Sequence, residues 1–344
     1  MVLRVHKFCE CVIVFIYLVN LYFIIRVISD LLSYSKQPME KPKTDLYTKY
    51  IQNSEVPEQF QNYTVNIIHT RLGYYKEKME IMLERTCRKN TYILNVVVSH
   101  ALNVNSREDI RTLHGNNSHS YRYNFSPMKN PANVSHCTVF AIGLTNNQGL
   151  NRLVEQEMIE KNDIILVPVI DEYRKIANKI MTYLKMLENS YLQFKYILKC
   201  DDDVYVDFER ILPFIYESPA IEYGGHLLSN LPTRRDPKDK WYLSEEEYPS
   251  DVIPKVVLGV ANIMNRKIIN KILKLHQSIK IHSMEDIYMT ELVLKADYNI
   301  IHISHLEYCL YNQLLCPKSC VLNIGRSNSF REFRLDKIRK KIYF

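Results

Sequence analysis

Four continuous apolar runs in the first 200 residues constrain the fold of this chain more than any other feature. They read TYILNVVVSH, CTVFAIGL, NDIILVPVI and FKYILKC, and each is rich in Val, Ile or Leu without regular polar alternation. Strands that are buried on both faces have this composition, and they occur in parallel sheets that helices cover. Between the third and fourth runs, residues 173–190 have the apolar spacing of an amphipathic helix. The sequence therefore predicts an α/β fold with a mostly parallel central sheet.

The N-terminal segment predicts attachment to a membrane. Residues 8–28 are mostly apolar and reach the roughly 20 residues that a helix needs to cross a bilayer, with Glu10, Asn20 and Arg26 as the polar exceptions. Arg4, His6 and Lys7 precede this segment, and the positive-inside rule then leaves the rest of the chain in the lumen. No small-residue cleavage site follows, so an uncleaved signal anchor is favoured over a cleaved signal peptide. The expected divisions are a cytoplasmic tail at 1–7, a transmembrane signal anchor at 8–28, a partly disordered stem at 29–88 and a luminal domain at 89–344.

Glycosylation sequons and cysteines agree with a secretory route. Sequons of the form N-x-S/T begin at Asn62, Asn116 and Asn133, and a fourth at Asn124 is weakened by Pro127. Six of the 8 cysteines follow the anchor, an even number that an oxidising compartment can pair in fifteen ways. These cysteines contain no CxxC pair and no regular zinc-ligand spacing, so the sequence favours disulfides over a zinc site.

Charge and composition argue against two classes of function. The net charge of +7 comes from basic residues spread along the chain, and no nucleic-acid-binding module is present, so we expect no nucleic-acid partner. Glycine is scarce, at 8 residues, and neither GxGxxG nor GxxxxGK[ST] occurs. A nucleotide would therefore be held by means other than a glycine-rich phosphate loop.

Three adjacent carboxylates, Asp201–Asp203, end the fourth apolar run. In an open α/β sheet the ligand crevice lies outside the carboxyl ends of the strands, which is where this run ends. Neighbouring anions raise one another's energy, so we expect a cation among them, and oxygen ligands suit Mg²⁺, Mn²⁺ or Ca²⁺. Such an ion usually completes its coordination with water and substrate phosphates. The alternative is that the triplet caps the next helix, although an N-cap needs only one Asp.

The segment KCDDDVYV, Lys199–Val206, resembles the K-x-D-D-D-x-F/Y-V motif of the β-1,3-galactosyltransferase family, which consists of inverting glycosyltransferases of the Golgi. Further motifs resemble those of the family and follow in the same order. They are Arg107–Arg111 (R-x-x-I-R), Asp163–Ile165 (D-I-I), Asp171–Lys179 (D-S-Y-x-N-L-x-x-K), Lys240–Ser244 (K-W-Y-V-S) and Glu285–Tyr288 (E-D-V-Y). The resemblance covers the chain from Thr91 to Cys320.

The resemblance implies a GT-A-like glycosyltransferase domain that uses Mn²⁺ or another divalent cation. It implies transfer of galactose from a UDP-galactose donor to a saccharide acceptor, on a glycoprotein or glycolipid, through a β-1,3 linkage with inversion. It also implies a single-pass type II protein of the Golgi membrane, held there by the N-terminal helix with its catalytic domain in the lumen. Transfer of N-acetylglucosamine is the nearest alternative.

The resemblance also assigns roles to single residues, and each role has a structural alternative. Asp203 would bind the metal, with His305 of the segment HISHLE completing the site, and Asp286 matches the catalytic base. The donor would be held by Asp201, Asp202, Arg107, Arg111 and Lys179, and the acceptor or its sugar would contact Trp241 and Glu285. The alternatives are flanking of the first helix for the arginines, the acidic first turn of a helix for Glu285 and Asp286, core packing for Trp241 and a structural role for His305.

Some segments depart from the family pattern. Where the family has a glycine and a tyrosine, this chain has Ala261 and Asn262 in the stretch PKVVLGVANIMN, so the fit of the donor could be altered. This departure motivates a second class of interpretation, a catalytically silent relative that binds glycans or acts as a chaperone for another transferase. The intact acidic triplet and Asp286 argue against it, because a silent protein has no need to keep mutually repelling carboxylates.

Overall fold

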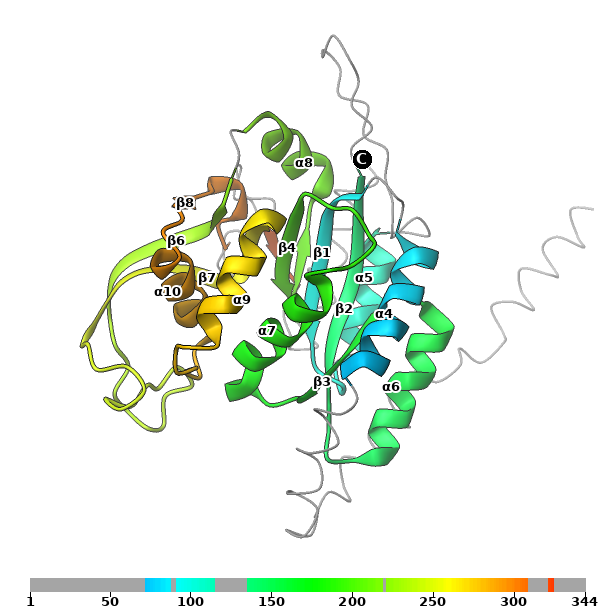
Figure 1. Cartoon of the computed structure of the whole chain (residues 1–344), viewed down its shortest axis with the longest axis horizontal. Helices are drawn as coiled ribbons and strands as arrows, with labels where there is room; N and C mark the ends of the chain where they lie inside the picture. The colour runs from blue at the N-terminus through cyan, green and yellow to red at the C-terminus, as the bar shows by residue number, and fades with distance from the viewer. Residues whose placement is uncertain (1–71, 88–90, 115–134, 219–220, 309–320, 325–344) are drawn as a thin grey trace, which may run out of the picture. The chain divides into compact units, whose positions relative to one another are not determined.

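The computed structural model describes residues 72–87, 91–114, 135–218, 221–308 and 321–324. In these ranges a central seven-stranded sheet has the strand order β3-β2-β1-β4-β7-β6-β8 (Figure 1). The sheet strands are β1 (Thr91–Ser99), β2 (Ser135–Leu144), β3 (Ile164–Ile170), β4 (Tyr196–Asp201), β6 (Tyr223–Pro232), β7 (Val252–Asn265) and β8 (Ile300–His302). A separate antiparallel pair joins β5 (Val204–Val206) to β9 (Val321–Asn323).

The sheet has a parallel half and a mixed half. Strands β3, β2, β1 and β4 are parallel to their neighbours, as the apolar runs predicted. Strand β7 then runs antiparallel to both β4 and β6, and β8 is parallel to β6. Four of the six neighbouring pairs are thus parallel, which confirms an α/β fold with a mostly parallel central sheet.

Helices on the sheet explain why the predicted strands are so apolar. Every residue of β1 except one is buried, and β2 is buried along nearly its whole length. The described α-helices are α4 (Leu72–Thr86), α5 (Val104–His114), α6 (Gln148–Lys161), α7 (Ile176–Leu187), α8 (Phe208–Glu217), α9 (Ile269–His276) and α10 (Glu285–Lys295), with short 3₁₀ turns η2 (Tyr173–Lys175), η3 (Arg266–Ile268) and η4 (Ser304–Leu306). Helices α7, α9 and α10 contact one another and lie in front of the sheet in Figure 1, while α4 and α6 contact the edge strand β3.

Helix α4 corrects the expected end of the stem. It lies inside the range 29–88 that the sequence assigned to a partly disordered stem, yet its residues Tyr75, Met79 and Leu83 are buried at helical spacing. Directly after α4, a disulfide joins Cys87 to Cys137 in β2. The helix therefore belongs to the folded domain, because packing and a covalent bond both attach it there.

Several expectations fall on residues that the structure does not describe. The tail, the anchor at 8–28, the remainder of the stem and the sequons at Asn62, Asn116 and Asn133 all lie outside the described residues. Within the described ranges, no helix combines the length and apolar character needed to cross a bilayer. Among the described residues Cys200 is a buried thiol without a disulfide, and Cys309, Cys316 and Cys320 lie outside them, so the pairing of these cysteines stays a prediction.

Candidate active site

A cavity of about 730 Å³ lies at the carboxyl ends of the parallel strands. The residues after β1, β3 and β4 line it, together with part of β7 and the first turn of α10. Five acidic residues that the sequence analysis singled out reach this cavity, namely Asp201, Asp202, Asp203, Glu285 and Asp286. The structure therefore brings the acidic triplet and the E-D motif, which are far apart in sequence, into one site.

The acidic triplet forms the turn between β4 and β5 rather than a helix cap. Asp201 is the last residue of β4, and Asp202 and Asp203 form the turn to β5. Helix α8 begins only at Phe208, and its N-cap residue is Asp207. The alternative that the triplet caps a helix is therefore wrong. The prediction that the triplet lies at the carboxyl end of its strand, beside the cavity, is confirmed.

The three carboxylates of the triplet have different surroundings. Asp202 is buried, and its Oδ2 accepts hydrogen bonds from Ser99 Oγ at 2.7 Å and Asn103 Nδ2 at 2.8 Å. Asp201 keeps 38% of its side chain exposed and contacts the ammonium of Lys199 at 2.9 Å. Asp203 is partly exposed to the cavity. Asp202 thus ties β4 to the segment after β1, while Asp201 and Asp203 are the members that a ligand can reach.

Arg107 does not reach the cavity, which corrects its expected donor contact. Its side chain is fully buried and forms two hydrogen bonds with Glu157, at 2.9 and 2.6 Å. The same guanidinium donates to Ser99 Oγ at 3.0 Å and to the carbonyls of His100 and Ala101. Arg107 thus joins Glu157 of α6 to the end of β1 and the loop after it, and it supports the site from behind.

Arg111 is used in a similar way. Two of its nitrogens contact both oxygens of Asp163 at 2.8 Å, and the third contacts Glu108 and Glu157 at 2.9 Å. These acidic residues raise the pKa of Arg111 against the lowering effect of burial. Arg111 is not among the residues that line the cavity, so the structure gives no support to its expected contact with the donor.

Lys179 lines the cavity, but its charge is already paired. Its Nζ contacts Asp171 Oδ1 at 2.5 Å and donates to the carbonyl of Ser99 at 2.9 Å. Asp171 Oδ2 in turn accepts from the backbone N–H of Gly143 at 3.2 Å. Lys179 therefore links the ends of β1, β2 and β3 at the mouth of the site, and only 3% of its side chain is exposed for a ligand.

Glu285 and Asp286 form the first turn of α10, as the helical pattern after them predicted. Burial raises the pKa of Glu285 to about 7, although Lys199, 2.7 Å from its Oε1, lowers it. Burial also raises the pKa of Asp286, against the lowering effect of the Ile287 N–H that bonds Oδ1 at 2.9 Å. A carboxylate with a raised pKa in a cavity has the properties of a general base.

Aromatic and basic side chains lie at the exposed side of the cavity. Trp241 is 54% exposed and lines the cavity, so core packing is excluded as its role. Lys240 places its ammonium 4.7 Å from the ring centre of Tyr173 and 5.9 Å from that of Trp241. Burial and the nearby acidic groups, Asp286 foremost, raise the pKa of Tyr173 to about 12. Exposed aromatic rings beside a polar cavity are suited to stacking on a sugar.

His305 does not join the acidic residues. It lies in the short turn η4, where its ring stacks on Phe214 of α8 at 4.2 Å between ring centres. It is not among the residues that line the cavity. The expectation that His305 completes a metal site with Asp203 is therefore not met by this arrangement.

The residues of the cavity fit a hard divalent cation that is only partly coordinated by protein. Asp201 and Asp203 supply carboxylate oxygens at the cavity surface. Among the described residues, no group of three or more His, Cys, Asp or Glu side chains is arranged as a complete metal site. A cation here would take one or two protein oxygens and obtain its other ligands from water and phosphate, which is the usual pattern for a nucleotide-bound metal.

Ala261 and Asn262, the two departures from the family pattern, lie in the sheet and not on the cavity wall. Both belong to β7, where Ala261 pairs with Cys200 and Asn262 pairs with Lys199 of β4. The residues of β7 that line the cavity all precede these two positions: Ile253, Val256, Leu258, Gly259 and Val260. Ala261 and Asn262 therefore alter the sheet behind the cavity, while other residues form the cavity surface.

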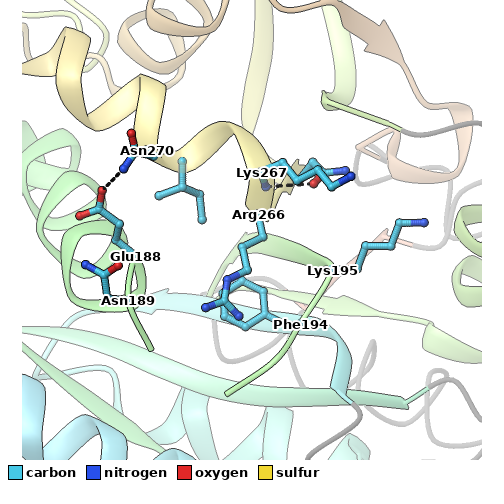
Figure 2. A pocket seen from close by; sticks show the side chains of 9 residues that line it. Glu188, Asn189, Phe194, Lys195, Arg266, Lys267 and Asn270 are labelled. Carbon is cyan, nitrogen blue, oxygen red and sulfur yellow. Dashed lines mark hydrogen bonds between the residues drawn. The ribbon is translucent and has the colours of Figure 1, made fainter. Parts of the chain in front are cut away.

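A second cavity, of about 400 Å³, lies at the opposite end of β4 (Figure 2). Its polar groups serve the fold. Asn270 donates to Glu188 at 2.8 Å, and Arg266 donates to the carbonyls of Leu192 and Ser190. It contains neither the acidic triplet nor the E-D motif. The chemistry predicted from the sequence is therefore concentrated in the first cavity.

Three residues of the site carry no role in the sequence analysis. Lys199 bonds both Asp201 and Glu285, Gly259 lies against Glu285, and Asn103 bonds Asp202. Lys199 is part of the K-x-D-D-D motif, and Gly259 is one of only 8 glycines in the chain, so both could have been noticed. Asn103 carries no sequence signal, because only the fold brings the segment after β1 beside the triplet.

Comparisons with known proteins agree with this geometry. The family model described as galactosyltransferase matches residues 105–305, which is more than half of the chain. Mouse beta-1,3-galactosyltransferase 1 is 25% identical over 235 residues, covering 67% of this chain and 68% of the mouse protein. The Drosophila melanogaster beta-1,3-galactosyltransferase brn is 26% identical over 175 residues, covering 49% of this chain and 53% of the fly protein. Chimpanzee beta-1,3-galactosyltransferase 5 is 23% identical over 154 residues, covering 44% and 52% of the respective chains.

A solved structure, the 4-diphosphocytidyl-2C-methyl-D-erythritol synthase of Anaerococcus prevotii, aligns with a TM-score of 0.35 at 8% identity, over 75% of this chain and 99% of its own. That similarity is too low to support an argument. The family match is different in kind, because it spans the acidic triplet, the E-D motif and the strands that bring them together. The chain belongs to the galactosyltransferase family of glycosyltransferases.

Proposed function

We propose that the protein is a metal-dependent, inverting hexosyltransferase that moves galactose from UDP-galactose to a saccharide acceptor through a β-1,3 linkage. The observation that carries this proposal is the meeting of Asp201–Asp203 and Glu285–Asp286 in one cavity at the carboxyl ends of the strands. Mouse beta-1,3-galactosyltransferase 1, which shares 25% identity with the chain, supports the choice of sugar and linkage.

Asp286 is the residue we assign as general base. The acceptor hydroxyl attacks C1 of the donor sugar, a new C1–O bond forms, and the bond from C1 to the phosphate oxygen breaks, releasing UDP. The hydroxyl proton passes to the carboxylate of Asp286 during this attack. Burial keeps the pKa of Asp286 above its usual range, which makes it a better proton acceptor than an exposed carboxylate.

Asp203 is the residue we assign to the divalent cation, with Asp201 beside it on the same turn. When bound, Mn²⁺ would supply positive charge against the charge that develops on the departing diphosphate. Asp202 is buried and bonded to Ser99 and Asn103, so it fixes the turn that presents Asp203. Trp241 and Tyr173 lie at the exposed side of the cavity, where the acceptor sugar can stack.

We propose that the protein is located in the Golgi membrane, with its catalytic domain in the lumen. The proposal is supported by the apolar segment 8–28 and by the positive charges that precede it. The disulfide between Cys87 and Cys137 is consistent with an oxidising compartment. Protease protection of the folded domain in sealed vesicles would test the orientation, since a luminal domain is cleaved only after detergent is added.

The test of the function is UDP release by the full-length protein in detergent. It is measured with UDP-galactose and UDP-N-acetylglucosamine, each with a panel of saccharide acceptors, with and without Mn²⁺. We expect acceptor-dependent turnover of UDP-galactose that is lost on chelation and lost in Asp203→Ala. Asp286→Asn should lower kcat by about a hundredfold or more while retaining UDP binding.

Other outcomes decide against this proposal. A preference for UDP-N-acetylglucosamine would reassign the donor. An absence of turnover with every UDP-sugar, in a protein that still binds glycans, would favour a catalytically silent relative. Full turnover in Asp203→Ala would show that the reaction does not depend on a cation bound by Asp203.

A further inference from the structure

A buried ammonium lies between the two acidic elements of the site. Lys199, in β4, has only 4% of its side chain exposed. Its Nζ donates to Asp201 Oδ1 at 2.9 Å, to Glu285 Oε1 at 2.7 Å and to the carbonyl of Gly259. An ammonium has three N–H groups, so all of the donors of Lys199 are used inside the protein. Lys199 is therefore unable to serve as a ligand contact.

The partners of Lys199 belong to three different elements. Asp201 ends β4, Gly259 lies in β7, and Glu285 begins α10 directly before Asp286. In the part of the chain that the structure describes, the ion pairs of Asp201 and Glu285 are with Lys199. One cation thus connects the strand that carries the triplet to the helix turn that carries the assigned base.

Helix α10 is fitted closely to β7 at the same place. A Cβ atom on Gly259 would lie 2.0 Å from Glu285 Oε1, so the carboxylate occupies the space that any other residue would fill. One turn further along, Thr290 Oγ1 donates to the carbonyl of Asp286 and accepts from the N–H of Val257. The first turn of α10 is therefore fixed to the sheet on both sides of Asp286.

The charges explain why this connection needs a cation. Glu285 is adjacent to Asp286, and Asp201, which is 38% exposed, faces them from β4, so three carboxylates lie close together. The ammonium of Lys199 lies 2.9 Å from Asp201 Oδ1 and 2.7 Å from Glu285 Oε1, so its positive charge compensates both carboxylates. Without the ammonium these carboxylates would repel one another or take up protons.

We propose that Lys199 is a positioning residue, which holds the first turn of α10 against the end of β4 and thereby fixes Asp286 relative to Asp203. The inference rests on the proposed function, because the distance it fixes is the one between the base and the departing diphosphate. It also assigns Glu285 to this connection and removes it from contact with the acceptor. A displacement of about 1 Å at a reacting group can lower a rate by roughly a hundredfold.

The experiment compares Lys199→Met with Lys195→Met in the full-length protein. Methionine keeps the length of the side chain and removes the charge. Lys195 is the matched control, because it lies near the start of the same strand, is exposed, and contacts Tyr92 Oη at 3.2 Å far from the acidic residues. The measurements are kcat and KM for UDP-galactose with acceptor, the dissociation constant of UDP with Mn²⁺, and the thermal unfolding midpoint.

We expect Lys199→Met to lower kcat at least tenfold while the dissociation constant of UDP changes less than threefold in the folded protein. Lys195→Met should leave both within twofold of the wild type. A merely structural lysine would lower the folded fraction, and with it kcat and the amount of bound UDP in the same proportion. Equal losses in both measurements would overturn the inference.

A second variant keeps the test decisive if Lys199→Met does not fold. Adding Glu285→Gln removes the carboxylate that would be left buried without a partner, so the double variant should fold. Because the two residues act through one connection, kcat of the double variant should be no lower than that of the worse single variant. Multiplicative losses would overturn the inference while leaving the proposed function intact. Absence of any turnover by the wild-type protein would overturn both.

Discussion

Replacing Gly259 with alanine would test the fit between β7 and α10 without removing any charged group. The added methyl carbon would lie 2.0 Å from Glu285 Oε1 and 2.9 Å from its carboxyl carbon. Ordinary contacts are about 3.5 Å, so the carboxylate has to move by roughly 1.5 Å. That movement is large enough to break the 2.7 Å contact between Glu285 and Lys199.

The magnitude follows from the two costs that this movement combines. Overpacking a closely fitted core costs about 1–3 kcal/mol. Depriving a buried charge of its partner costs about 3–5 kcal/mol, but here Lys199 retains Asp201 and the carbonyl of Gly259. We therefore expect Gly259→Ala to lower the free energy of unfolding by about 2–4 kcal/mol.

The assay is urea unfolding of the full-length protein, followed by circular dichroism and analysed for a change in midpoint at constant slope. Gly73→Ala in α4 is the matched control, because a Cβ at Gly73 would meet no atom within 4 Å. It should leave stability unchanged or raise it by up to about 1 kcal/mol, since alanine favours a helix over glycine. Glu285→Asp shortens the side chain that the new methyl group would meet. The double variant Gly259→Ala/Glu285→Asp should therefore lose less unfolding free energy than the sum of the losses in the two single variants. A loss below 1 kcal/mol in Gly259→Ala, or full additivity with Glu285→Asp, would refute the reasoning.

Three further predictions concern stability, pH and the support of the loop after β1. Because the disulfide between Cys87 and Cys137 spans 50 residues, replacing either cysteine with alanine should lower the free energy of unfolding by about 4 kcal/mol, and the double replacement should cost no more than that. The pKa of Glu285 is raised from 4.5 to about 7 on folding, so it favours the folded state below pH 4.5 and this contribution is lost as the pH rises through 7. Between pH 5 and pH 8 the free energy of unfolding should therefore decrease by on the order of 3 kcal/mol more in the wild type than in Glu285→Gln. An equal decrease in both proteins would contradict the raised pKa of Glu285. Arg107→Lys should raise KM for UDP-galactose and lower the free energy of unfolding by about 2 kcal/mol, because lysine lacks the two-nitrogen fork that bonds Glu157. An unchanged KM would show that the loop after β1 keeps its conformation without Arg107.

The sequence predicted the parallel half of the sheet well for a physical reason. Strands such as β1 and β4 are buried on both faces, so most of their residues are apolar and the pattern is visible without any partner. The acidic triplet could be placed as well, because the end of a buried strand in an open sheet is the mouth of the site. The E-D motif was located on a helix start by its pattern, and α10 begins there.

Features that depend on distant partners could not be predicted. Arg107 was expected to face a phosphate, but its carboxylate partner, Glu157, lies 50 residues away and is brought near by the fold. Strand β7 is partly exposed at its start and buried from Ala261 to Asn265, where it pairs antiparallel to β4, and its sequence did not indicate this pairing. The packing of α4 was missed because its buried positions are separated by several charged residues, which suggested a solvated segment.

The disulfide also has a topological consequence. It encloses β1 and α5, so every peptide bond between residues 87 and 137 belongs to a covalent ring. A protease that cut the chain once within that ring would leave two polypeptides that still travel together on a non-reducing gel and separate only after a thiol is added. The residues after β1 that support the cavity would then remain attached to the domain, even in a nicked molecule.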